Sequence, residues 1–426
     1  MTLNYKPRIA VIGGGVAGIL TCYLLQNQAD VTLFEKNNYV GGHTNTIVLT
    51  EGPDSGTPVD TGFIVLNNWT YPNFHHFLKK LQVPLRNSDM SFGYYCESSN
   101  LQYAGTTLNG LLAQRKNLFR PRFLQLIRDF LRFNYVAKQD LTEGNDLRLI
   151  SLGTYLRKYR FSESFIQDYL IPVSSAIWST ARPEMLDFPT EVFLRFFQNH
   201  GLLNLFKRPQ WQTVVGGSFT YVKAFLNQFS GTVQKNSKIR EVARTPEKIS
   251  VSLQTGETLD FDFVIFAVHA DEVLKLLACP SEEEQRLFGV WKYQQNETIL
   301  HTDTSIMPPN RRAWASWNVI REKNASYENP VSMTYDMNRL QGLRTQKRYL
   351  VSLNLQKRID PRHILKEIQY THPRFTLASL DSREKIKQLN GNHRTYFVGS
   401  YFGYGFHEDA VRSAVEMTQQ HFGVSF

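Results

Sequence analysis

The first 35 residues alternate apolar segments with a glycine-rich turn. Residues 9–12 form a short apolar run typical of a buried strand, and a run of glycines follows it directly. Residues 17–26 then favour a helix, and residues 31–35 form a second apolar run that ends in a carboxylate. This order predicts the strand, helix and strand that open a doubly wound α/β domain.

Segments of the same kind return in two later parts of the chain. Apolar periodicity predicts helices at 71–81, at 221–229 and from His407 onward. Strand-type segments are expected at 88–103, 232–234, 239–242, 249–253, 258–268 and 395–398. We therefore predict a fold that is α/β in its core and α+β overall. Its Rossmann-like nucleotide-binding domain comprises residues 1–85, 212–275 and 385–426, and a discontinuous substrate-binding domain comprises residues 86–211 and 276–384.

The glycines after the first strand have the spacing of a dinucleotide-binding turn. Gly13 permits the tight turn, Gly15 has no Cβ to hold a diphosphate away from the backbone, and Gly18 lets the helix pack closely on the strand. Val16 and Ala17 begin the helix, whose N-terminal amides attract phosphate groups. Because the turn follows a strand and precedes a helix, the context supports a nucleotide site.

Two further pairs of residues extend this predicted site. Glu35, with Lys36 beside it, follows the second strand, where a carboxylate accepts hydrogen bonds from ribose hydroxyls. Gly41 and Gly42 supply flexible backbone amides close to the other half of the cofactor.

Two stretches combine basic and aromatic residues. Residues 114–138 contain only one acid, Asp129, and predict a basic amphipathic helix, and residues 193–211 are a second stretch of this kind. Such helices lie on anionic bilayers, but they also occur with the apolar face on the core and the arginines in solvent. Two such stretches favour membrane or lipid contact slightly. The arginines in question are Arg120, Arg122, Arg128 and Arg132.

Composition narrows the class of protein. The 426 residues are 42% hydrophobic and carry a formal charge of +10. No nucleic-acid-binding signature accompanies that charge, so we expect no nucleic-acid partner. Cys22, Cys96 and Cys279 form no disulfide or zinc pattern, and the adjacent His75 and His76 point in different directions, so no metal site is predicted. No secretory signal or membrane span is recognisable, which predicts a cytoplasmic protein, with a peripheral position at the inner membrane face as the alternative.

These motifs resemble those of the flavin-containing amine oxidases, phytoene desaturases and protoporphyrinogen oxidases. The resemblance rests on the glycine turn, on Glu35 and on the Gly41–Gly42 pair, and it implies FAD as the cofactor. His43 stands where these families usually place arginine, and Ser400 where they usually place an acid. By resemblance, Val242 would contact the adenine. The other cofactor contacts implied are His43, Thr44, Gly399, Ser400, Gly405 and Phe406.

Four blocks resemble a narrower group, the NAD/FAD-binding proteins related to the flavoprotein domain of plant cyclopropane fatty acid synthases. The blocks are residues 174–179, 300–303, 313–318 and 403–409. The resemblance implies a fatty acyl or related lipid substrate that is dehydrogenated by hydride transfer to flavin N5. We expect His407, which titrates near neutrality when unperturbed, to handle the proton, with Tyr404 nearby. Candidates for lining the substrate site are Trp178, Trp314, Trp317 and Tyr335.

Several alternatives stay open. The chain has one glycine turn of this kind, so we expect electrons to leave to oxygen, a quinone or a carrier rather than to come from a nicotinamide. A flavin-dependent fatty acid double-bond isomerase, a silent FAD scaffold for a lipid methyltransferase and an amine oxidase are the alternatives. Net bleaching of the flavin by substrate would distinguish a dehydrogenase from an isomerase.

Overall fold

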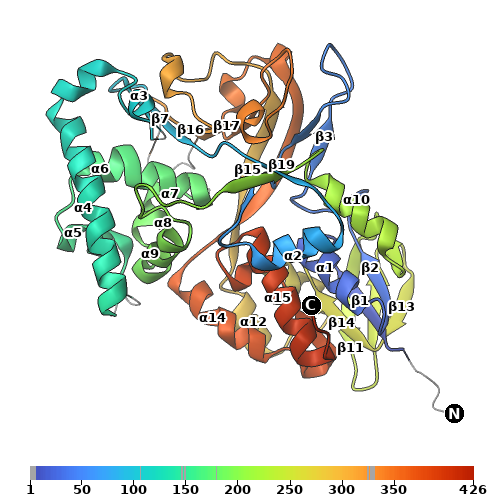
Figure 1. Cartoon of the computed structure of the whole chain (residues 1–426). Coiled ribbons are helices and arrows are strands. Elements are labelled where there is room, and N and C mark those ends of the chain that lie inside the picture. The colour runs from blue at the N-terminus through green and yellow to red at the C-terminus, as the bar shows by residue number, and fades with distance from the viewer. Residues whose placement is uncertain are drawn as a thin grey trace.

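A five-stranded parallel sheet forms the base of the half of the molecule that contains the glycine turn (Figure 1). The computed structural model describes residues 6–105, 107–144, 147, 150–178, 180–323, 326 and 332–426, so residues 1–5 and Ser179 of the 174–179 block lie outside the described part. The strand order is β10-β2-β1-β14-β20, and every pair is parallel. The strands are β1 (Arg8–Ile12), β2 (Asp30–Phe34), β10 (Thr232–Gln234), β14 (Phe263–Phe266) and β20 (Thr395–Phe397).

The two faces of this sheet are covered differently because side chains alternate along a strand. Ile9 and Val11 pack with helices α1 (Val16–Leu25), α2 (Pro72–Lys80), α10 (Phe219–Gln228) and α15 (His407–Phe422). Ala10 and Ile12 face a small antiparallel sheet and two helices. These elements are β11 (Ile239–Arg244), β12 (Ile249–Leu253), β13 (Thr258–Phe261), α12 (Glu282–Phe288) and α14 (Leu377–Gln388). The predicted α/β class is confirmed.

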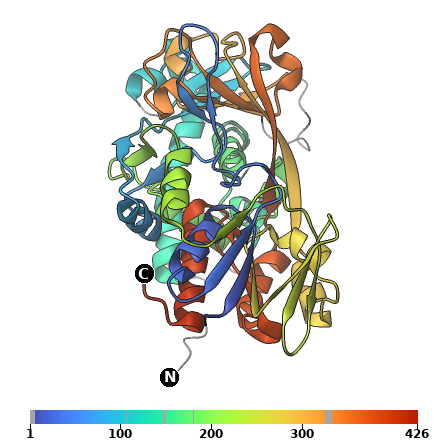
Figure 2. The same cartoon turned by 90° about the vertical axis from the view of Figure 1, so that its right-hand side faces the viewer.

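A seven-stranded mixed sheet forms the core of the other half, with order β19-β15-β18-β17-β16-β7-β8. Its two longest strands, β15 and β19, pair antiparallel and run from the upper to the lower part of the molecule, in gold and orange in Figure 2. The strands are β7 (Phe92–Cys96), β8 (Leu101–Ala104), β15 (Lys292–His301), β16 (Trp317–Arg321), β17 (Ser332–Asp336), β18 (Leu350–Leu353) and β19 (Ile364–Arg374).

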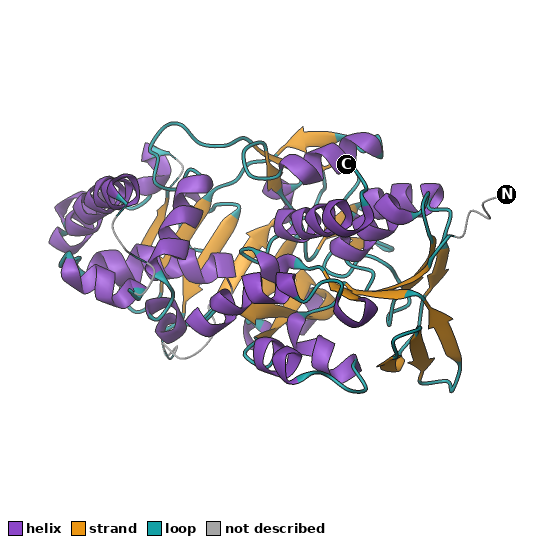
Figure 3. Ribbon diagram, turned by 90° about the horizontal axis from the view of Figure 1, so that it is seen from below, coloured by secondary structure: helices purple, strands orange, loops and turns teal. Residues whose placement is uncertain are grey.

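Helices from the middle of the chain, cyan and green in Figure 1, gather at one end of the molecule, the left end in Figure 3. They are α4 (Pro121–Glu143), α5 (Leu152–Lys158), α6 (Glu163–Phe165), α7 (Ile171–Trp178), α8 (Arg182–Leu186) and α9 (Thr190–Asn199). The remaining elements are β3 (Thr46–Val48), β4 (Pro58–Asp60), β5 (Leu66–Asn67), β6 (Leu85–Asn87), β9 (Trp211–Val214), α3 (Leu108–Leu111), α11 (Ala270–Leu276) and α13 (Met337–Leu340).

The structure corrects three of the predicted elements. Residues 258–268 are two strands of different sheets, because Asp262 pairs with the backbone of Arg8 and turns the chain onto β1. In the 114–138 stretch the α-helix starts only at Pro121, which fits the first helical position. The 193–211 stretch is helical only to Asn199, because Gly201 has a left-handed φ of 67°.

No helix in the described part of the chain is both long and apolar enough to cross a bilayer.

Candidate functional site

A cavity of about 860 Å³ opens at the carboxyl ends of β1, β2, β14 and β20. Doubly wound sheets bind their ligands at this edge, and the volume is at the upper end of the usual range of about 300–1,000 Å³ for ligand pockets. Most of the predicted site residues line it. They are Gly13, Gly15, Val16, Ala17, Glu35, Lys36, Gly41, Gly42, His43, Trp178, Trp317, Tyr335, Gly399, Ser400, Tyr404, Gly405, Phe406 and His407.

The three fingerprint glycines differ in what a side chain would meet. At Gly13 a Cβ would lie 2.5 Å from the Ala267 carbonyl oxygen, and at Gly18 it would lie 2.0 Å from the Gly13 carbonyl oxygen. The protein itself therefore requires glycine at both positions. At Gly15 a Cβ would meet no protein atom within 4 Å, and the residue lines the cavity. Space beside Gly15 is thus kept for a ligand, which fits the diphosphate of a dinucleotide.

Glu35 is held rigidly at the ribose end of this predicted site. Its Oε2 accepts the Gly14 N–H at 2.9 Å and its Oε1 accepts the Asn37 N–H at 2.8 Å. Each carboxylate oxygen keeps a further lone pair, so ribose hydroxyls could still donate to it. Lys36 lines the same wall and pairs with Glu272 at 2.6 Å.

Val242 does not line the cavity. Its side chain is fully buried and its carbonyl oxygen accepts the Ala278 N–H at 3.0 Å. The cavity wall near this strand is formed instead by Ser237, Lys238 and Ile239, at the start of β11. This part of the cavity wall is therefore three to five residues earlier in the chain than Val242, and its last residue, Ile239, is the first residue of β11 to pair with β12.

Three other predicted residues lie outside the cavity wall. Gly18 is buried in α1, where it faces the Gly13 carbonyl oxygen. Thr44 is buried, with its hydroxyl 2.5 Å from the Tyr221 hydroxyl and 3.1 Å from His407 Nε2. Trp314 donates its Nε1 hydrogen to the Pro308 carbonyl oxygen, and an arginine side chain covers its ring. Thr44 thus supports His407, and Trp314 has a structural role away from the site.

His407 lies at the first position of α15 and lines the cavity. Its ring stacks on Phe63 with 3.7 Å between centroids. Burial lowers the pKa of His407 to about 3, so the ring is neutral at physiological pH. The expectation that His407 titrates near neutrality was wrong, because the sequence does not show the apolar surroundings. Burial, with Asp409 nearby, likewise raises the pKa of Tyr404 and keeps its hydroxyl protonated.

Three histidines that are far apart in the sequence meet on the cavity wall. His43, His269 and His372 all line it, and the His43 ring centroid lies 5.7 Å from that of His269 and 5.4 Å from that of His372. Sequence reasoning singled out only His43. No local signal marks His269 or His372, since they come together only when β14 and β19 are in place.

The far end of the cavity is apolar and aromatic. Sequence reasoning found Trp178, Trp317 and Tyr335 there but missed several neighbours. Those are Ala176, Ile177, Trp211, Ile368 and Phe375. Among the described lining residues there is no arginine, and the only carboxylates are those of Glu35 and Glu272. In the described part of the chain no cluster of three metal-ligating side chains occurs.

Known proteins resemble this chain over most of its length. An L-amino-acid oxidase from Siganus canaliculatus is 22% identical over 287 residues, which is 64% of this chain and 50% of that protein. The chain thus spans about half the length of that relative. A CLA-producing fatty acid isomerase from P. acnes has the same fold, with 13% identity, a TM-score of 0.69 and coverage of 98% of this chain and 99% of the other. Putrescine oxidase bound to putrescine matches equally, with 13% identity, a TM-score of 0.70 and the same coverage.

The family model for flavin-containing amine oxidoreductases matches residues 16–336. This match includes the helix after the glycine turn, the cavity wall around Glu35 and His43, and the aromatic end at Trp317 and Tyr335. The chain therefore belongs to the flavin-containing amine oxidoreductase family.

Proposed function

We propose that this protein is an FAD-dependent oxidoreductase whose substrate is an uncharged acyl chain. The observation that carries the proposal is the single cavity, which joins a dinucleotide turn at one end to an apolar aromatic pocket at the other. FAD fits this cavity better than a mononucleotide would. Beyond the glycine turn the cavity continues past the Glu35 carboxylate, which is placed to bind a ribose, to a further wall formed by residues 237–239.

The charges of the lining residues support an apolar substrate. An amino acid substrate would call for an arginine or lysine to hold its carboxylate, and an amine would call for an acid. The three lysines of the wall are Lys36, Lys238 and Lys275, which lie at the adenosine end, and Glu272 is already paired with Lys36. The aromatic end therefore suits an acyl chain better than an amino acid or an amine such as putrescine.

Bound FAD would supply the two-electron acceptor for a substrate C–H bond. The chain's own residues position the substrate and exclude water. Trp178 and Trp317 form apolar walls, and the neutral His407 ring is fixed between Phe63 and the Thr44 hydroxyl. Because its pKa is lowered to about 3, the neutral His407 ring is only a weak base, and Tyr404 stays protonated, so neither is suited to take a proton from the substrate at neutral pH.

This last point favours a second candidate, a double-bond isomerase. Desaturation releases a proton for which the described lining residues offer no strong base at the aromatic end, whereas moving a double bond has no net loss of hydrogen. The P. acnes isomerase shows that the fold is compatible with this outcome.

Anaerobic mixing of the FAD-loaded protein with phospholipids that carry unsaturated or saturated acyl chains tests the proposal. Net bleaching of the flavin with a new double bond in the product supports a dehydrogenase. A shifted double bond without net bleaching supports the isomerase. Bleaching by amines or amino acids alone would refute the acyl proposal, and no reaction with any of them would favour a scaffold.

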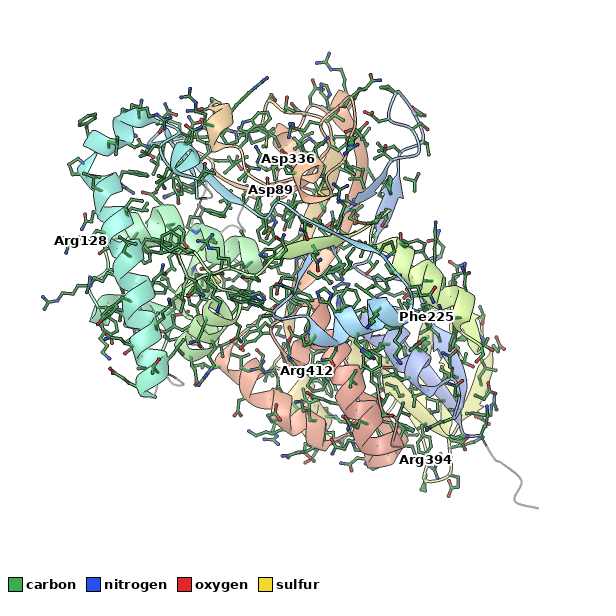
Figure 4. All side chains as sticks on the ribbon, in the orientation of Figure 1. Asp89, Arg128, Phe225, Asp336, Arg394 and Arg412 are labelled. Atoms are coloured by element: carbon green, nitrogen blue, oxygen red, sulfur yellow. The ribbon has the colours of Figure 1, made fainter. Side chains whose placement is uncertain are left out.

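We further propose that the substrate is met at an anionic membrane surface. Two of the most exposed apolar side chains, Phe119 at 86% and Phe206 at 95%, come from the two basic stretches. Arg128 is exposed on the outer side of α4 (Figure 4). Arg122 and Arg132, by contrast, pair with Asp168 and Asp129 within the fold. The surface for an anionic lipid is therefore defined by Phe119, Phe206, Arg120 and Arg128.

A further inference from the structure

The cavity poses a question of charge balance. A dinucleotide diphosphate is an anion at every physiological pH, and no arginine lines the described cavity wall. Two of the lysines on the wall already have acidic partners: Lys36 pairs with Glu272 at 2.6 Å, and Lys275 pairs with Asp271 at 3.2 Å. The third, Lys238, lies just before β11 at the adenosine end. Apart from the amides at the start of α1, the side chains left near the glycine turn that can carry a positive charge are imidazoles.

His43 is the imidazole nearest to the turn. It follows Gly42, and a Cβ on Gly42 would lie 3.1 Å from the Gly15 Cα, so the two glycine segments are in contact. The His43 backbone is fixed, because its carbonyl oxygen accepts the Phe63 N–H at 2.8 Å. Its ring stacks on Tyr370 with 5.0 Å between centroids. A diphosphate resting on Gly15 would therefore meet a rigidly placed ring.

The hydrogen bonds of the ring leave one nitrogen open. His43 Nε2 lies 3.2 Å from the Thr371 carbonyl oxygen, which only accepts, so the Nε2 hydrogen is committed there. Nδ1 then has a lone pair and can take a proton. His372 differs, since its Nδ1 faces the Asn296 amide nitrogen at 2.9 Å and thus acts as an acceptor, which leaves a neutral N–H at Nε2.

The surroundings hold this site neutral until an anion arrives. Burial lowers the pKa of His43 well below its ordinary value, and His372, His269 and His407 lower it further. Burial also lowers the pKa of His372 to about 4 and that of His269. The nearby phenols, Tyr39, Tyr293 and Tyr370, have raised pKa values and stay uncharged, and the Glu35 carboxylate is bound to the Gly14 and Asn37 amides.

We propose that His43, His269 and His372 form an anion site for the diphosphate of the dinucleotide, and that His43 takes up a proton at Nδ1 when the diphosphate binds. The new Nδ1–H donates to a phosphate oxygen, while His372 contributes its neutral Nε2–H. Binding of the cofactor is then coupled to pH. This inference rests on the proposed binding of FAD.

The direction of the coupling follows from linkage. Binding raises the pKa of His43, so the added affinity is complete below the pKa of the free protein and is lost as pH rises through the pKa of the complex. The diphosphate itself does not titrate in this range. For one proton the dissociation constant rises up to about tenfold per pH unit within that window.

Calorimetric titration of the flavin-free full chain with FAD tests this, using buffers with different ionisation enthalpies at pH 7. The dependence of the observed heat on buffer enthalpy gives the number of protons taken up. We expect net uptake and weaker binding from pH 5.5 to pH 8 for the wild type. His43→Gln should bind FAD more weakly with no uptake. His43→Arg, which is always charged, should bind FAD without uptake and with an affinity that does not depend on pH.

The control is His301→Gln. His301 is also buried with its pKa lowered to about 4, but it bonds to Ser352 outside the cavity wall, so its replacement should leave proton uptake unchanged. FAD binding to the wild type without proton uptake overturns the inference and leaves the proposed function standing. No binding of FAD overturns both. Uptake only when oleate is added to the FAD-loaded protein would assign the site to a carboxylate and overturn the diphosphate assignment.

Discussion

Replacing Gly15 with alanine separates the needs of the ligand from those of the fold. Gly15 has φ −73°, which alanine adopts readily, and its added Cβ would meet no protein atom within 4 Å. The free energy of unfolding should therefore change by about 1 kcal/mol or less, the usual range for a helix N-cap substitution. The Cβ points into the cavity, and filling a site that a ligand occupies typically costs about 1–3 kcal/mol. This corresponds to a roughly 5- to 150-fold rise in the dissociation constant for FAD.

Gly18→Ala is the matched comparison, because the same methyl group there would lie 2.0 Å from the Gly13 carbonyl oxygen. We expect this variant to lose about 1–3 kcal/mol or more of folding stability even without ligand. Quenching of flavin fluorescence measures the dissociation constant, and urea unfolding of the flavin-free protein measures stability. The reasoning is refuted if Gly15→Ala binds FAD like the wild type, or if it loses as much stability as Gly18→Ala.

Four further outcomes are expected. Glu284→Gln should cost about 3–5 kcal/mol in urea unfolding, because it leaves Arg244 buried beside a neutral partner, and a loss below about 1 kcal/mol would contradict this. The neutral His301 ring should contribute about 3 kcal/mol to the free energy of unfolding. This contribution is complete above pH 6.5 and is lost as pH falls towards the pKa of about 4, so in His301→Gln the free energy of unfolding should depend less on pH in this acidic range. In His407→Gln the pH dependence of anaerobic flavin reduction between pH 5 and 8 should match the wild type, since the ring is neutral throughout; a lost ionisation in that range would show that the ring titrates. The protein should cosediment with anionic but not zwitterionic liposomes at low salt. Changing Phe119 and Phe206 to Ser and Arg120 and Arg128 to Gln should abolish this, with each arginine contributing about 1 kcal/mol to the binding free energy. Equal cosedimentation by the variant would remove this surface from the proposal.

Local patterns predicted the parts of the site that local chemistry determines. Gly13, Gly15 and Glu35 were recognisable because a turn, a helix start and a strand end fix their positions within one segment. The residues that line the cavity near β11 were not recognisable, because the Val242 carbonyl oxygen accepts the Ala278 N–H, a contact that only the folded chain makes.

The environment of individual side chains was the second property that could not be predicted from the sequence. The residues packed around His407 come from distant segments of the chain. The lowering of its pKa therefore could not be predicted from the sequence. Trp314 looked equivalent to Trp317, yet one ring is covered by arginines and the other lines the cavity. The histidine cluster depends on β19 crossing from one half of the protein to the other.

The parallel sheet also has a consequence for biosynthesis. β1 leaves the ribosome well before its neighbour β14, which follows some 250 residues later, and before β20, which comes later still. Helix α15 completes the layer, and its Glu408 carboxylate accepts the backbone N–H groups of Asn73 and Phe74 from α2. The nascent chain therefore cannot complete its cofactor site until β20 and α15 have emerged from the ribosome. Until then its early strands are exposed or bound by chaperones.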